Sequence, residues 1–307
     1  MWRQIARRLI LSVVVLWLVV TIAFLAMRFV PGDPVALMLQ KSGASAQRIA
    51  EVRHQLGLDQ PTAVQYVKYL AGVVRGDLGK SIFTGRPVTE VVLEQFPATL
   101  ELTIASMVVG VSLGLLLGLA SALREGSLLD NALMVFAVFG VSMPSFWFGL
   151  LLIYGFSLRL GWLPATGQGG ISRLIMPAVV LGLGIAATIA RITRSSMVEV
   201  MRKEYITTAR AKGLRERVVI ARHALKNALI PILTMIGLEV GWLLGGAVVT
   251  ETVFSRQGLG RLTINAVTQM DFPLVQGAVL FMAVFYMASN LAVDVLYVVV
   301  DPRIQTK

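Results

Sequence analysis

Residues Thr99–Ala122, TLELTIASMVVGVSLGLLLGLASA, form an apolar run that contains a single charged residue, Glu101. The hydrocarbon core of a bilayer is about 30 Å thick, and a helix of about 20 residues crosses it. A single segment satisfies all of its backbone polar groups inside hydrocarbon only when it is helical. The stretch therefore predicts a membrane-spanning helix.

The composition extends this prediction to the whole chain. Its 307 residues are 56% hydrophobic and 15% charged, and the mean hydropathy is +0.76. These values lie outside the range of soluble domains and are typical of a polytopic membrane protein. The net charge of +11 comes from basic residues that flank apolar segments. Positive-inside topology and anionic lipid explain that charge, so we expect the lipid bilayer, and no nucleic acid, as a partner.

Five further apolar stretches complete a prediction of six transmembrane helices. They are Leu9–Val30, Ala132–Leu158, Leu174–Thr193, Leu229–Val249 and Gln276–Val300. The first is too long for a signal-peptide core and leads to no small-residue cleavage site, so we expect it to be retained. Arg3, Arg7 and Arg8 precede it and place the N-terminus in the cytoplasm. The predicted fold is an all-α polytopic membrane protein with both termini in the cytoplasm.

The order of these segments predicts three parts. Residues 1–30 form the cytoplasmic N-terminus and the first transmembrane helix. Residues 31–98 form a small extracytoplasmic helical region, with short helices expected at Ser45–Leu56 and Pro61–Val74. Residues 99–307 form a five-helix core that includes a cytoplasmic segment at 191–228.

Small residues and prolines indicate how the spans pack. Gly110, Gly114 and Gly118 stand four residues apart and leave one bare strip on the second span, which allows close approach of another helix. Pro144 in the third span and Pro177 at the start of the fourth each remove a backbone donor, so we expect both to kink their helices.

Charged residues inside the spans are few, and each costs on the order of 3 kcal/mol at the bilayer centre. Glu101 and Asp294 lie near the membrane interfaces, where a structural role is expected. Glu239 lies about ten residues into the fifth span. It either lines a hydrated path or pairs with a neighbouring span. A kink at Pro144 either opens a polar cavity around Ser142 or only bends the helix, so the predicted substrate path consists of Ser142, Pro144 and Glu239.

Known catalytic arrangements are missing from the sequence. There are no cysteines, which excludes thiolate nucleophiles and cysteine-ligated metal and leaves the redox compartment undetermined. His54 and His223 fall in regions on opposite sides of the membrane, so neither a metal site nor a serine protease is expected. Gly79-Lys80-Ser81 does not form a phosphate loop, because the first glycine of that motif would fall on Val74. We therefore expect a transport protein rather than an enzyme.

The most basic region is Arg191–Lys226, with ten Lys and Arg residues against three Glu. We predict one helix in which Val198, Met201, Tyr205 and Ala209 share a face, ended by Gly213. A second helix, about Glu216 to Asn227, then returns toward Pro231.

The small residues around Ala209 leave the first of these helices thin. They are Thr207, Thr208, Ala209 and Ala211. Such a helix fits a groove in a cytoplasmic partner, and its basic flanks suit acidic or phosphate groups. The alternative is an amphipathic helix that rests on anionic lipid.

Two stretches in this region resemble the EAA motif of ABC transporter permease subunits, in the form found in dipeptide and oligopeptide importers. They are Glu204-Tyr-Ile-Thr-Thr-Ala-Arg-Ala-Lys-Gly213 and His223-Ala-Leu-Lys-Asn-Ala-Leu-Ile-Pro231. The resemblance covers nearly the whole chain. It includes Pro31-Gly-Asp-Pro34, Gly76-Asp-Leu-Gly-Lys-Ser81, Arg191-Ile-Thr-Arg-Ser-Ser-Met197, Thr250-Glu-Thr-Val-Phe254, Gly258-Leu-Gly-Arg261, Asp294-Val-Leu-Tyr297 and Asp301-Pro-Arg303.

The resemblance implies a multi-pass protein of the bacterial inner membrane that imports dipeptides, oligopeptides or related solutes. It implies a second permease subunit in a heterodimer, two ABC ATPase subunits or domains, and an extracytoplasmic substrate-binding protein. ATP and magnesium would be used by the partner ATPase, and this chain would bind no cofactor or metal. The ATPase would dock on a coupling helix within 204–213, whose implied contact residues are Glu204, Tyr205, Thr208, Ala209, Arg210, Lys212 and Gly213.

Three positions depart from the family pattern. Thr207 stands where arginine is common, Arg256-Gln257 where a proline often precedes the glycine, and Glu239 where glutamine is frequent. The cargo stays open among peptides, glutathione-like solutes, glycosides and metal chelates. Two alternatives from other classes are a proton-coupled secondary transporter that uses Glu239 and a scaffold protein that binds lipid.

Overall fold

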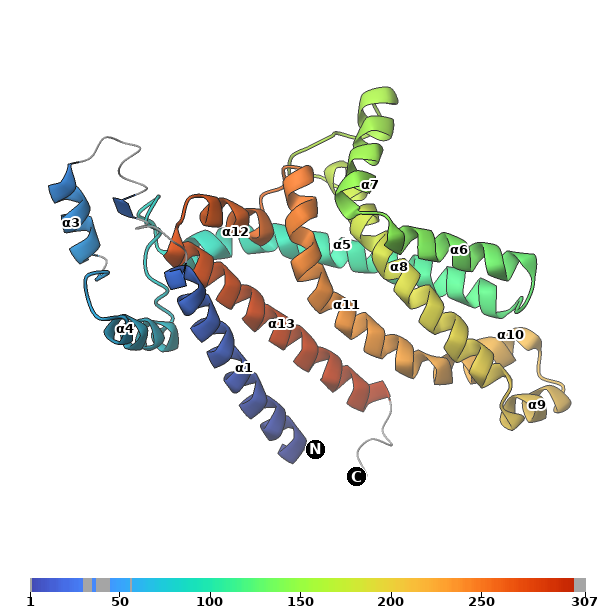
Figure 1. Ribbon diagram of the computed structural model, residues 1–307. Coiled ribbons are helices and arrows are strands. Elements are labelled where there is room, and N and C mark those ends of the chain that lie inside the picture. The colour runs from blue at the N-terminus through green and yellow to red at the C-terminus, as the bar shows by residue number, and fades with distance from the viewer. Residues whose placement is uncertain (1, 30–34, 37–44, 56, 301–307) are drawn as a thin grey trace. The chain divides into compact units, whose positions relative to one another are not determined.

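The computed structural model describes residues 2–29, 35–36, 45–55 and 57–300 (Figure 1). Over these residues the protein is helical, and the extended structure is an isolated bridge between Lys80 and Pro87. The predicted all-α class is therefore confirmed. The motifs Pro31-Gly-Asp-Pro34 and Asp301-Pro-Arg303 lie outside the described residues.

The chain divides into two compact units. The first comprises Met1–Pro97 and Gly258–Met287, and the second comprises Ala98–Gln257 and Ala288–Lys307. Two long helices, α5 (Val88–Ala122) and α13 (Phe272–Val300), contribute residues to both units. The predicted division into three parts is a statement about membrane sides and stays a prediction.

The first unit contains α1 (Trp2–Phe29), α3 (Ala46–Gln55), α4 (Thr62–Arg75), α12 (Leu259–Thr268) and the first turns of α5 and α13. The bounds of α3 and α4 agree with the two short helices predicted from sequence. Helix α4 packs on α1, since the Phe24 ring lies 5.3 Å from that of Tyr66 and 5.6 Å from that of Tyr69. It ends at Gly76, whose φ of 77° is the left-handed conformation that glycine adopts without strain.

Two features of this unit differ from the sequence-based expectation. Helix α5 begins at Val88 instead of Thr99 and continues through Pro97. Its first turns are stabilised by packing, because Val88, Val91 and Val92 are buried in an apolar cluster with residues of α12 and α13. Helix α12 was not predicted, and it buries Leu259 in the same cluster.

The second unit contains the rest of α5 together with nine further helices or helical segments over its described residues. These are α6 (Leu128–Ser142), α7 (Ser145–Leu152), η1 (Ile153–Arg159), α8 (Ser172–Met201), α9 (Glu204–Ala211), α10 (Glu216–Val218), η2 (Val219–Leu225), α11 (Lys226–Val253) and the end of α13. Helices α8 and α11 lie side by side, and α9 and α10 lie near one end of α8 (Figure 1).

The glycine strip of α5 lies against α8. A Cβ atom at Gly110 would lie 2.6 Å from Cβ of Ile185, and one at Gly114 would lie 2.6 Å from Cβ of Ile189. Gly118 lies as close to Thr193. The predicted close helix approach is confirmed, because these distances leave no room for a side chain.

The prolines act differently in the two helices for which kinks were predicted. The helical segments on either side of Met143 and Pro144 are bent by more than 40°, which confirms the kink at Pro144. Helix α8 instead runs unbroken through Pro177, which lies in its second turn. Helix α11 likewise continues through Pro231.

Several helices are long and apolar enough to cross a membrane. Among the described residues four qualify: Val88–Ala122, Ser172–Met201, Glu216–Leu243 and Phe272–Ala292. The bent pair Leu128–Gly140 and Ser145–Arg159 makes a fifth if it is one span, and α1 adds a shorter apolar helix at Ile10–Ala26. The protein is therefore multi-pass, whereas six crossings and the position of both termini stay predictions.

Candidate functional site

The first of the two helices predicted in the basic region is divided between α8 and α9. Helix α8 ends at Met201, and Lys203 is extended, with φ −73° and ψ 143°. The prediction that Val198 and Met201 share a helix face with Tyr205 and Ala209 is therefore wrong. The extended residue Lys203 separates α9 from α8, and Ile206 of α9 is buried in the core.

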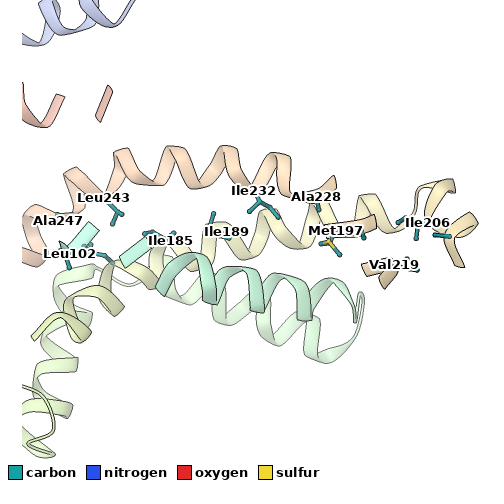
Figure 2. Packing of buried hydrophobic residues seen from close by; sticks show 13 residues of the cluster. Leu102, Ile185, Ile189, Met197, Ile206, Val219, Ala228, Ile232, Leu243 and Ala247 are labelled. Carbon is teal, nitrogen blue, oxygen red and sulfur yellow. The ribbon is translucent and has the colours of Figure 1, made fainter. Parts of the chain in front are cut away.

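Helix α9 has one buried face and one exposed face. Ile206 and Ala209 are buried, with 0% and 6% of their surface exposed, whereas its other six residues are exposed. Figure 2 shows Ile206 beside Val219 and Met197 at one end of an apolar cluster. The cluster continues along α8 and α11 through Ile189, Ala228 and Ile232, among others. The buried face of α9 thus packs on η2, and the shared cluster connects it to both long helices.

Two features fix the C-terminal end of α9. Gly213 has φ 77°, and a Cβ atom there would meet nothing within 4 Å, so the backbone conformation is what favours glycine. Arg210 donates hydrogen bonds of 2.7 and 3.1 Å to the carboxylate of Glu216. These bonds raise the pKa of Arg210 and hold α9 to the start of α10. The predicted break at Gly213 is confirmed.

The segment after α9 differs from a simple return helix. It begins with α10, passes through the π-helical η2 and continues without a gap into α11. A π-helix is rare and often marks a functional position in a helical protein. Here it buries Val219 and Ala224 in the cluster that also holds Ile206.

The structure separates the seven predicted coupling residues by position. Glu204, Tyr205, Thr208, Arg210 and Lys212 are exposed, Gly213 forms the turn, and Ala209 points into the core. Thr207, the departure from the family pattern, belongs to the exposed face. Contact of this face with a partner stays a prediction.

A second candidate site is a cavity of about 360 Å³ bordered by α6, α7, α8 and α11. Glu239 lines it. Ser142 and Pro144 do not: Ser142 is exposed and donates a hydrogen bond of 3.0 Å to the Val138 carbonyl, and Pro144 precedes α7. The kink at Pro144 instead brings Met143, Ser145 and Phe148 to the cavity wall.

Both parts of the chain match models of one family of transport proteins. The family described as "Binding-protein-dependent transport system inner membrane component" matches residues 110–306, and its N-terminal companion matches residues 1–103. The chain belongs to this family. It is a multi-pass protein of the bacterial inner membrane and a permease component of a transport system.

Relatives and solved structures agree with that assignment. The permease is 43% identical to the di/tripeptide transport system permease protein DppB of Pseudomonas aeruginosa, over 98% of each chain. It is also 43% identical to the glutathione transport system permease protein GsiC of Salmonella paratyphi A, over 100% of each chain. The fold resembles a chain of the inward-facing MetNI methionine ABC transporter, with a TM-score of 0.57 and 20% identity over 69% of the permease and 96% of that chain.

A buried ion pair that sequence reasoning missed lies close to the coupling region. Arg194 on α8 donates two hydrogen bonds of 2.6 Å to Asp130, which is 1% exposed at the start of α6. Asp130 also accepts from Ser121 and from the Gly126 amide. Two features of the sequence could have indicated this ion pair. Arg194 belongs to one of the motifs that resemble the family, and Ser127 is the N-cap residue of the helix that contains Asp130, whose amide donates to the Ser127 hydroxyl group.

A second ion pair joins two charged residues whose contact was not predicted from the sequence. Arg256 follows α11, and its buried side chain donates a hydrogen bond of 2.8 Å to Glu101 on α5. The structural role predicted for Glu101 is therefore confirmed. The side chain of Asp294, its predicted counterpart at the other interface, lies outside the described part of the chain.

Proposed function

We propose that this chain is the permease subunit of an ABC importer for short peptides or related solutes such as glutathione. The observation that carries the proposal is the two-faced helix α9, exposed on one side and joined to the core of α8 and α11 on the other. Family membership supports an ATP-driven importer over a proton-coupled carrier. The names of the relatives support peptide-like cargo.

In this proposal a separate ATPase binds the exposed face of α9, and ATP and magnesium act in that partner. Closure of the ATPase dimer moves α9 as a rigid part. Ile206 and Ala209 pass the movement to α8 and α11, because a close-packed apolar cluster transmits displacement with little compression. The helices then alternate between inward-open and outward-open arrangements by rigid-body rotation.

The remaining partners complete the path. A second permease subunit, in a heterodimer, supplies the other half of the channel, and an extracytoplasmic binding protein delivers the solute. The cavity beside Glu239, at about 360 Å³, lies within the usual range for small-molecule sites of about 300–1,000 Å³. Glu239 is therefore the predicted path residue that the geometry supports best.

The test is reconstitution of the complex with its ATPase and binding protein in liposomes. Thr208→Arg places a long cation on the exposed face of α9 and is expected to abolish ATPase association and peptide uptake. Val74→Arg is the matched control, because Val74 is 87% exposed on α4, far in sequence from α9. Normal ATPase association and uptake in Thr208→Arg would contradict the docking assignment.

A further inference from the structure

The cavity beside Glu239 combines a carboxylate with an aromatic wall. Its lining comes from four helices and the break after α6: Gly140, Met143, Ser145, Phe148, Val180, Leu181, Gly184, Thr188, Leu238, Glu239 and Trp242. Glu239 is the one charged side chain among these lining residues. No lysine, arginine or histidine of the described chain lines the cavity with it.

A carboxylate at this position is costly without a positive partner. Glu239 lies in the middle of α11, within a helical stretch that is long and apolar enough to cross a membrane, and it is partly buried. Acidic residues inside spans are rare, face cavities or other helices, and mark paths of ions and substrates. Two other acidic residues of this unit have arginine partners, Asp130 with Arg194 and Glu101 with Arg256, and the buried Glu251 accepts a hydrogen bond from Thr99. Within the described ranges, Glu239 has no arginine partner of the kind that Asp130 and Glu101 have.

The rest of the lining suits an ammonium group. Trp242 stands three residues after Glu239 and shares its side of α11. Its ring reaches α8, since a Cβ atom at Gly184 would lie 3.8 Å from the indole. Phe148 provides a second ring in the lining, and aromatic faces attract cations within about 6 Å of the ring centroid. The hydroxyl groups of Ser145 and Thr188 are further acceptors for N–H donors.

We propose that this cavity recognises the primary ammonium group of the transported solute, with Glu239 as its counter-ion and Trp242 and Phe148 as its aromatic wall. The inference rests on the proposed import of peptide-like solutes and deepens it. It assigns a selection step to the permease, in addition to any selection by the binding protein. The amino terminus of a short peptide has the required chemistry, and an N-acetylated peptide lacks it.

The experiment measures binding to the permease–ATPase complex without the binding protein, so that the binding protein's own preference does not enter. The complex, in lipid nanodiscs, is titrated with radiolabelled dialanine and with N-acetyl-dialanine. The native protein is expected to prefer dialanine about tenfold or more, the factor that one charge-assisted hydrogen bond supplies. Glu239→Gln is expected to bind both peptides alike, whereas Glu239→Asp retains part of the preference.

Glu94→Gln is the matched control, because Glu94 is exposed on the first turns of α5 and forms an exposed pair with Arg86. It is expected to leave the preference unchanged. The same preference in Glu239→Gln as in the native protein would overturn the inference. So would loss of complex stability in Glu239→Gln with the preference retained, since Glu239 would then pair with the second permease subunit.

Failure of this inference is distinguishable from failure of the proposed function. The proposed function is measured separately, as stimulation of ATP hydrolysis by the peptide-loaded binding protein. If that stimulation is present and the native permease binds both peptides equally, the importer assignment stands and the ammonium site is refuted.

Discussion

Ile206 anchors α9, the proposed coupling helix, in the apolar core of the permease. It is 0% exposed, and Ala209 is the other residue that α9 buries. Truncation of a buried isoleucine to alanine costs about 2–5 kcal/mol, and truncation to valine about 0.5–1.5 kcal/mol. Ile206→Ala therefore removes most of the apolar anchorage of α9, whereas Ile206→Val retains it.

The consequence is a loss of coupling that exceeds the loss of ATPase binding. The exposed face is unchanged in Ile206→Ala, so the ATPase is expected to remain in the complex. Solute transported per ATP hydrolysed is expected to fall several-fold in Ile206→Ala and to change little in Ile206→Val. The assay measures both rates in the same proteoliposomes. The melting temperature of Ile206→Ala shows whether the truncation destabilises the protein. A lowered melting temperature together with an unchanged ratio of solute transported to ATP hydrolysed would refute transmission through this core.

Three further predictions concern packing and ion pairs, and thermal unfolding of the purified complex measures all of them. Gly114→Ala is expected to destabilise by about 1–3 kcal/mol, because its Cβ would overlap α8, whereas Gly155→Ala adds a methyl group in open space and is expected to be near neutral. Asp130→Ala leaves its arginine partner without a carboxylate and is expected to cost about 3–5 kcal/mol. Glu101→Gln is expected to cost about 1–3 kcal/mol, since its carboxylate is half exposed while the Arg256 side chain is buried, and Arg256→Met in the same chain is expected to recover part of that loss. A neutral Gly114→Ala, a neutral Asp130→Ala, or a double variant worse than the sum of its parts would contradict the respective account.

Most of the long helices could be predicted from the sequence, because a membrane-spanning helix requires a long run of apolar residues. The short helices α3 and α4 were also predictable, since each is bounded by local signals, such as the glycine at 76. The extension of α5 back to Val88 could not be predicted from local signals. Its first turns contain charged residues and precede a proline, and they are held by tertiary contacts with α12 and α13 that no local pattern reveals.

The candidate site was predictable in outline and wrong in detail. The motif predicted a helix at the residues where α9 lies, and Gly213 ends it as expected, whereas its coupling role stays a prediction. A helical periodicity continued across Met201 was misleading, because no glycine or proline marks the turn at Lys203. Packing of Ile206 decides that turn. Ala209 is a second case in which local sequence did not reveal packing. Its small size suggested a thin docking face, whereas Ala209 is buried and lets α9 lie close to the core.

Because Ala209 is buried, docking of the ATPase on α9 is better tested at other positions. A bulky residue at Ala209 would disrupt the permease's own core, so a loss of uptake there would not report on docking. Substitutions on the exposed face avoid this problem. Thr208 is suitable because its hydroxyl group contacts the Glu204 carbonyl of its own helix and no core residue.

Docking of the ATPase on α9 can be measured by site-specific crosslinking, because the chain contains no cysteine. A single cysteine at Thr208, and separately at Val74, is labelled with a short photo-crosslinker in the assembled complex. The docking account predicts a crosslink from Thr208→Cys to the ATPase subunit and none from Val74→Cys. Absence of the ATPase crosslink from Thr208→Cys in a complex that still hydrolyses ATP would contradict the account.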